Sequence, residues 1–398
     1  MPTDASTDAL RVDPIDRADP RARALTDLDR RRIGFLRLVL VLALVFLHYG
    51  EIYGSPFSPY RGYQGQAVPV ASILVSFILF LGFTAVPAMS AISGFLFFQG
   101  ATARRPPDFA RKMRRRVHSL VVPFLLWGIF FSTIGFAAHR VFPFLFSDYF
   151  GAGAGVIREL TNAVIGVNTT PLAYQLWFVR DLILTVAVSP LIWILIGRLP
   201  WLTLAVLVPL WILGQNLVIF HRLDVLLFFS FGALFAMHGI RPELPRRWVV
   251  PVFALFLAAA MARTLAPWIL GRAEGLGFDI ATGAMRILGA LAVWNAAPLV
   301  LGTRFAAWVE RNTYLAFYIH AGHYPPILFL KLGLGSMIDP GSEVAQITLY
   351  FLCVGLTISG LILLGHVLER RTPRLFRIIS GGRTATGSGQ ERPGFLPT

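Results

Sequence analysis

The sequence predicts an all-α fold: a polytopic membrane helical bundle of about ten transmembrane helices, with both termini in the cytoplasm. Composition and hydropathy carry this prediction. Of the 398 residues, 56% are hydrophobic and only 14% are charged, and the mean hydropathy is +0.65. Several apolar runs are long enough to cross a hydrocarbon core of about 30 Å. The expected spans cover residues 33–50, 70–98, 117–138, 178–197, 200–219, 222–239, 248–270, 284–301, 313–331 and 345–367.

Basic residues gather in alternate loops of this arrangement. The loop 104–116 carries seven basic residues and one Asp, the loop 241–247 carries three basic residues and one Glu, and the segment after Glu369 is rich in Arg. The intervening loops are balanced or acidic. Because cytoplasmic loops carry the excess of Lys and Arg, both termini are placed in the cytoplasm. The same pattern explains the net charge of +15 without a nucleic-acid partner, and the partner that the composition implies is the lipid bilayer.

The chain divides into a membrane domain over 33–370 between two polar tails, 1–32 and 371–398. The first tail holds seven Arg and seven Asp without apolar clusters, and the second is basic, so both are expected to be disordered and cytoplasmic. The second apolar run is long for one crossing, and Pro87 is expected to kink it. The single Cys353 excludes disulfides and cysteine metal sites, and no metal is expected.

Two ionisable residues stand in the first predicted span. Arg37 and His48 are eleven positions apart, so on a helix they share one face and lie about 16 Å apart along the axis. Glu51 joins that face if the helix continues. Ionisable groups inside a membrane are costly and indicate function. The alternative is that Arg37 extends to the headgroups while His48 is a core histidine with satisfied hydrogen bonds.

Further polar groups lie in or beside other spans. The candidates are Ser93, Arg116, Trp177, Arg180, Asp181 and His320. Each has a structural alternative: Arg116 fits a positive-inside anchor, Arg180 and Asp181 fit a neutralised ion pair, and Ser93 with Gly94 fits a close helix contact. These residues alone leave a transporter and a membrane enzyme equally open.

Taken in order, five sequence elements resemble the integral membrane acyltransferase family 3, over residues 30–370. The elements are Arg37 with His48, Met89–Leu96, Lys112–Trp127, Leu176–Leu182 and Tyr314–His320. The chain departs from the family's pattern at two positions. His118 stands where members often have a second Arg or Lys, and Gln175 stands where many have His.

This resemblance implies a multi-pass enzyme of the bacterial inner membrane. It would transfer an acyl group, commonly acetyl, from cytoplasmic acyl-CoA to a hydroxyl of an extracytoplasmic glycan or lipid-linked sugar. His48 would be the general base, since the pKa of histidine suits proton transfer near neutrality. Arg37, Arg116 and Ser93 would bind the donor, the arginines through its phosphates. By spacing alone, we expect Glu51 to fix the tautomer of His48. The residues expected to bind substrate are Trp177, Arg180, Asp181 and His320.

A reaction in a single site also requires a polar passage between Arg37 and His48. The rival hypothesis is a proton-coupled transporter or exporter of a glycan or small acid, in which these two residues line the path. An internal repeat and paired broken half-helices, which mark many transporters, are not evident in the sequence.

Overall fold

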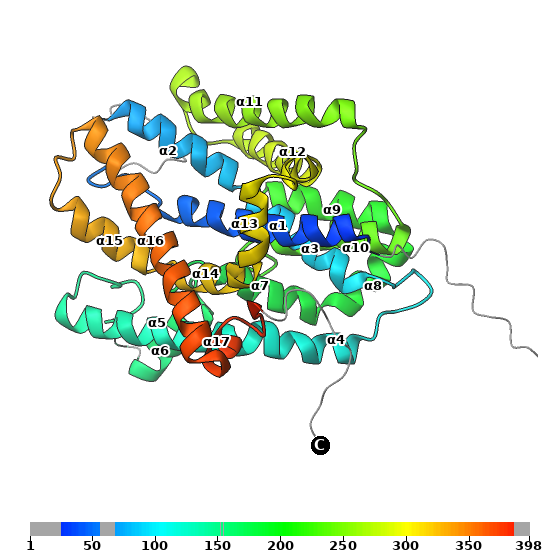
Figure 1. Ribbon diagram of the computed structural model, residues 1–398, viewed down its shortest axis with the longest axis horizontal. Coiled ribbons are helices and arrows are strands. Elements are labelled where there is room, and N and C mark those ends of the chain that lie inside the picture. Colours follow the sequence, from blue (N-terminus) through cyan, green and yellow to red (C-terminus); the bar gives the residue numbers. More distant parts are fainter. Residues whose placement is uncertain (1–24, 56–67, 152, 154, 386–398) are drawn as a thin grey trace, which may run out of the picture.

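The computed structural model describes residues 25–55, 68–151, 153 and 155–385, and over these residues it is helical without a strand. Helix α1 (Asp27–His48) lies in the middle of the bundle. In the view of Figure 1, α11 (Arg246–Leu270) and α12 (Leu276–Val300) lie above α1, and α4 (Phe109–Arg116) and α5 (Val122–Val141) lie below it. The central helix therefore carries the Arg37–His48 face through the interior of the protein.

Helix α1 begins inside the segment predicted to be a disordered tail. Thr26 and Asp29 form a capping box, in which each side chain accepts the other residue's backbone N–H at 3.1 Å, and this satisfies two donors of the first turn. Arg32 is buried, pairs with Glu243 at 3.3 Å and lies over the Trp294 ring. The predicted tail boundary at residue 32 is therefore wrong for residues 27–32, while residues 1–24 lie outside the described residues.

The second apolar run forms two helices, α2 (Pro69–Gly82) and α3 (Ala85–Phe98). The break lies at Phe83 and Thr84, and not at Pro87, which sits in the first turn of α3 where proline is tolerated. The third run is one segment in which α4, a π-helical turn over Val117–Val121 and α5 follow one another. It is followed by the short α6 (Val156–Ile165).

Two predicted single spans are broken. The fourth is α7 (Leu176–Ala187) and α8 (Ser189–Arg198), which meet at 65°. The ninth is a 3-10 turn (Thr313–Leu315), α14 (Ala316–Gly322) and α15 (Pro326–Gly335), since proline at 325 and 326 ends the helix. The remaining helices are α9 (Pro200–Ile212), α10 (Asp224–His238), α13 (Arg304–Asn312), α16 (Glu343–Arg371) and α17 (Pro373–Ile379).

Several helices have the length and apolarity of membrane spans. Among the described residues there are five such segments, or six if the bent α7–α8 pair is one span. The five are Pro69–Phe98, Phe109–Val141, Arg246–Leu270, Leu276–Val300 and Glu343–Arg371. The protein is therefore a multi-pass helical membrane protein, while ten spans and cytoplasmic termini stay predictions.

Helices α3 and α10 touch backbone to backbone. A Cβ on Gly94 would lie 2.1 Å from the carbonyl oxygen of Phe229, and one on Gly232 would lie 2.1 Å from that of Ala91. Only glycine permits such an approach. The small residues beside Ser93 therefore make a helix contact, as the structural alternative predicts.

The segment after α16 packs on the bundle. Phe376 of α17 is buried against the rings of Tyr314 and Tyr318, and the indole N–H of Trp127 donates a hydrogen bond to the carbonyl of Ile379 (3.0 Å). The prediction of a disordered tail from residue 371 is wrong up to residue 385. Residues 386–398 lie outside the described residues.

Candidate active site

His48, the last residue of α1, meets a histidine that the sequence analysis did not select. Its Nδ1 lies 2.7 Å from Nε2 of His323, and the two rings stack with centroids 4.9 Å apart and an interplanar angle of 16°. His323 follows α14 directly, and its Nδ1 lies 3.0 Å from the carbonyl oxygen of Ile319.

These distances assign the tautomers of both neutral rings. A carbonyl oxygen only accepts, so Nδ1 of His323 carries the proton and donates to Ile319. Nε2 of His323 is then an acceptor, and Nδ1 of His48 donates to it. His48 is left with an unprotonated Nε2. That nitrogen has the lone pair that a general base requires.

Glu51 does not fix the tautomer of His48, contrary to prediction. Helix α1 ends at His48, and Gly50 at φ +70° turns the chain away. Glu51 is exposed, and its backbone carbonyl accepts a hydrogen bond from Nζ of Lys331 (3.1 Å). The shared helical face that predicted its role therefore ends before it, and His323 takes that role.

A small cavity of about 30 Å³ lies beside His48. It brings together three residues predicted for the site: His48, Trp177 and His320. His320 is buried beside the backbone of Gln175, and neither of its ring nitrogens makes a hydrogen bond of standard geometry with a described residue. Since buried polar groups are nearly always paired, His320 has hydrogen-bonding capacity left at this cavity.

Two arginines also line this cavity. Arg286 forms an ion pair with Asp224, which accepts a hydrogen bond from the Trp211 indole (2.8 Å). The guanidinium of Arg222 lies 5.5 Å from the centre of the Trp177 ring. Positive charge fixed beside a base favours a reaction in which negative charge develops.

The adjacent pair Arg180–Asp181 acts on this site indirectly. Asp181 is buried and accepts the backbone N–H groups of His221 and Arg222 (both 3.0 Å) as well as Nη1 of Arg180 (2.9 Å). Burial and the charges of Arg180 and Arg222 lower the pKa of His221 to about 4. Neither member of the pair lines the cavity. The pair is the neutralised ion pair of the structural alternative, and it positions Arg222.

At the other end of the α1 face, Arg37 lies close enough to Arg116 for their charges to interact. Both are half-buried. Ser93, predicted beside them, is half-buried on α3, lines neither the cavity nor the apolar pocket below, and makes no side-chain hydrogen bond with a described residue. Arg37 and Arg116 therefore lie near one another, whereas no contact connects Ser93 to them, and donor binding by these residues stays a prediction.

The cavity beside His48 does not extend to Arg37, so it does not form the predicted passage between these two residues. On α1 the cavity reaches from His48 to Leu44 and no further toward Arg37. The packing between the two ends includes α14, which places Phe317, His320 and His323 three residues apart on one face. A reaction between the two ends therefore requires this packing to open.

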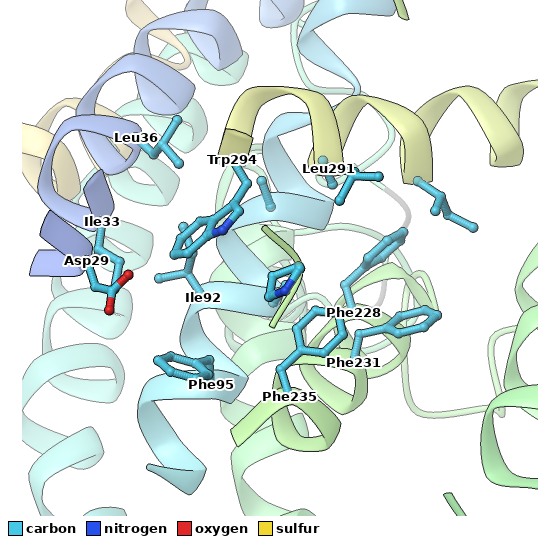
Figure 2. Close-up of a pocket in the computed structure, with 15 residues that line it drawn as sticks. Asp29, Ile33, Leu36, Ile92, Phe95, Phe228, Phe231, Phe235, Leu291 and Trp294 are labelled. Atoms are coloured by element: carbon cyan, nitrogen blue, oxygen red, sulfur yellow. The ribbon is translucent and has the colours of Figure 1, made fainter. Parts of the chain in front are cut away.

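A larger pocket opens elsewhere between α1, α3, α10 and α12. Figure 2 shows it surrounded by aromatic rings, including those of Phe228, Phe235 and Trp294. Asp29 is its only charged lining residue, and this carboxylate belongs to the cap of α1. Its other lining residues carry no titratable side chain. His48 and His320 line the histidine cavity and His323 contacts both. Among the described residues no group of three or more His, Cys, Asp or Glu could hold a metal ion.

Comparison with known proteins identifies the family of this chain. The model of the acyltransferase domain of family 3 matches residues 30–376. The chain belongs to this family. The acyltransferase is also 29% identical over 362 residues to the succinoglycan biosynthesis protein ExoH of Rhizobium meliloti (strain 1021), covering 89% of this chain and 92% of that protein. No solved structure matches.

The acyltransferase site contains residues that sequence reasoning missed. His323 follows His320 by three residues, a spacing that puts both on one helical face, so a signal was present. Arg222 is placed by the loop bonded to Asp181, and Arg286 by its ion pair with Asp224. Those two depend on tertiary contacts, for which the sequence has no local pattern.

Proposed function

We propose that this membrane acyltransferase moves an acyl group, acetyl in the simplest case, from a cytoplasmic acyl-CoA to a hydroxyl of an extracytoplasmic glycan or lipid-linked sugar. The observation that carries the proposal is the 2.7 Å contact of His48 Nδ1 with His323 beside a cavity lined by two arginines, from which we infer that Nε2 of His48 is unprotonated. Family membership and the relative named for succinoglycan biosynthesis support the reaction class and the glycan acceptor. The proposed location is the bacterial inner membrane.

The reaction follows from the proton positions. Nε2 of His48 takes the proton of the acceptor hydroxyl as its oxygen attacks the thioester carbonyl. The new C–O bond forms, the C–S bond breaks, and the CoA sulfur leaves as a thiolate that takes the proton back from His48. His323 holds the ring of His48 through Nδ1 and stabilises the imidazolium that forms in between. One positioned base of this kind contributes about 10²–10⁴-fold in rate.

In this proposal, the two ends of α1 bind different parts of the acyl-CoA donor. Arg37 and Arg116 bind the phosphates, for which the planar guanidinium is suited. Arg222 and Arg286 stabilise the oxyanion of the tetrahedral intermediate. The axial distance of about 16 Å between Arg37 and His48 is one that an extended pantetheine arm covers, once the packing along α14 opens.

The test uses the purified protein in lipid nanodiscs with acetyl-CoA, together with mass spectrometry of surface glycans from cells with and without the chain. We expect ester groups to disappear from one glycan when the chain is absent. Transfer should also disappear in His48→Ala, with the variant still inserted and monodisperse. Normal acylation by that variant would refute the mechanism.

One observation favours the transporter alternative. Broken helices, which the sequence analysis did not find, occur at α7–α8 and α14–α15, and discontinuous helices mark the binding sites of many transporters. The second break places His323 on His48, so it also serves the enzyme. The same nanodisc assay separates the two functions, because a pure transporter neither hydrolyses nor transfers the acyl group of acetyl-CoA.

A further inference from the structure

A third arginine joins Arg37 and Arg116, and it comes from outside the segment that matches the family. Arg383 lies in a turn after α17, beyond residue 376 where the match ends. Its Nη1 donates to the carbonyl of Ser380 (3.0 Å), and the hydroxyl of Ser380 donates to the carbonyl of Arg383 (2.7 Å). The turn therefore holds its own arginine in place.

Two glycines seat this turn against the third membrane segment. Gly381 and Gly382 have φ of +69° and +85°, a region that glycine adopts readily. A Cβ on Gly381 would lie 2.5 Å from the carbonyl oxygen of Ser119, in the π-helical turn three residues after Arg116. The turn 380–383 is thus anchored beside the backbone that carries Arg116.

Arg383 belongs to the turn that packs on the backbone of Ser119, and it lies near enough to Arg37 and Arg116 for their charges to act on it. Burial and the positive charges of Arg37 and Arg116 lower the pKa of Arg383 to about 9. The Arg383 guanidinium lies 5.3 Å from the centre of the Phe317 ring on α14. Neither Arg116 nor Arg383 forms an ion pair with a carboxylate of the described residues. Gathering like charges in a partly buried place is unfavourable unless an anion offsets it.

We propose that Arg383 is a third phosphate-binding arginine, and that the turn 380–383 completes a donor site with Arg37 and Arg116. The choice of acyl-CoA as the ligand rests on the function proposed above. Its diphosphate and 3′-phosphate present several anionic oxygens, which three planar guanidinium groups bind in pairs of hydrogen bonds. Arg383 positions the donor and does not touch the reacting atoms.

The position of this cluster directs the donor toward His48. Phe317 lies under Arg383, and His320 and His323 follow on the same face of α14 at intervals of three residues. From Phe317 to His323 the helix rises about 9 Å. A donor whose phosphates rest on the three arginines therefore has its acyl end directed along α14 toward the histidine pair.

The experiment measures the affinity of the full-length protein for CoA and for adenosine 3′,5′-bisphosphate in nanodiscs of phosphatidylcholine. Arg383→Gln removes the positive charge but keeps a hydrogen-bond donor for the carbonyl of Ser380. Arg383→Lys keeps the positive charge but lacks the planar guanidinium, which can donate two parallel hydrogen bonds to one phosphate. Arg374→Ala removes an exposed arginine from the same segment as the matched control. We expect Arg383→Gln to weaken both ligands about 10- to 100-fold, the loss typical of a charged hydrogen-bond pair. Arg383→Lys should restore part of the affinity and Arg374→Ala should change nothing.

Kinetics give a second readout that a purely structural role would not move. Arg383→Gln should raise KM for acetyl-CoA while KM for the acceptor and kcat stay within about twofold, because the residue acts only on donor binding. A fall in kcat with unchanged KM would overturn the proposal. So would unchanged CoA affinity in a well-folded Arg383→Gln protein.

The outcomes also separate this inference from the proposed function. Absence of CoA binding by the wild-type protein would overturn the function itself, whereas wild-type binding that Arg383→Gln leaves intact would overturn the third arginine alone. Nanodiscs containing phosphatidylglycerol test the other source of phosphate. If the cluster holds a lipid headgroup, Arg383→Gln will reduce retention of the anionic lipid without changing CoA affinity, and this would reject the donor assignment.

Discussion

The polar groups at the two ends of helix α1 are stabilised in different ways. At the histidine end, the proton positions are fixed by neutral hydrogen bonds that run from His48 through His323 to the carbonyl of Ile319. At the arginine end, Arg37, Arg116 and Arg383 gather positive charge. A neutral pair is complete without a ligand, whereas a cluster of cations is stabilised by an anion. This difference fits the two roles proposed above, proton transfer at the histidine end and anion binding at the arginine end.

Removing the base should have the largest effect. In His48→Ala we expect the rate of acyl transfer to fall about 10²–10⁴-fold, because the variant lacks the imidazole that takes the proton of the acceptor hydroxyl in the proposed reaction. Affinity for CoA should be unchanged, since that depends on the arginine end. Transfer assays with radiolabelled acetyl-CoA and equilibrium binding check both statements. Equal losses in both measurements would show that the two ends are not separate sites.

Removing the orienting partner should cost less. In His323→Ala the proton on Nδ1 of His48 loses its acceptor, and the imidazolium loses its stabilising contact. We expect kcat to fall about 10- to 100-fold, the value of a hydrogen bond to a charged group. His323→Gln, which offers an oxygen acceptor, should recover part of that loss. A full rate in His323→Ala would separate this residue from the reaction.

At the arginine end, Arg116→Ala should raise KM for the donor about 10-fold and leave kcat nearly unchanged, since phosphate binding is the same in ground state and transition state. Arg115→Ala removes an exposed neighbouring arginine and serves as the control. Initial rates over a range of acetyl-CoA concentrations give both constants. A fall in kcat with constant KM would show that Arg116 acts in the chemical step, and it would contradict the assignment of donor binding alone to the arginine end.

The smallest effect is expected at Glu51. Its side chain is exposed beyond the end of α1, so Glu51→Gln should change the rate by less than about twofold. Steady-state transfer assays check this. A loss comparable to that of His323→Ala would restore the role predicted from spacing and reject the tautomer assignment made from His323.

The sequence was sufficient where a helix is continuous. Arg37 and His48 share a face because their spacing and the uninterrupted apolar run define one helix, and the structure keeps that helix to His48. The role predicted for Glu51 was wrong because it assumed that the helix continues beyond His48. The positive φ of Gly50 turns the chain away from that helical face. Helical spacing is a reliable guide only as far as the helix itself extends.

Breaks and docked segments were harder to predict. The apolar pattern of residues 313–331 predicts one span, but Pro325 and Pro326 break it, and the break brings His323 onto His48. Arg383, in basic surroundings, is predicted to lie in a disordered tail. Its true position depends on Phe376 packing on Tyr314 and Tyr318, a tertiary contact without a local pattern.

The docking of α17 also sets an order of assembly. Residues 373–385 follow all the long apolar helices of the described residues, so during synthesis they leave the ribosome after those helices. Their contacts are with residues made earlier, including Trp127 of α5 and Ser119. The arginine cluster is therefore completed only after the segments that Arg383 packs on have been made. A chain that lacks residues 373–385 contains His48 and His323 but not the third arginine.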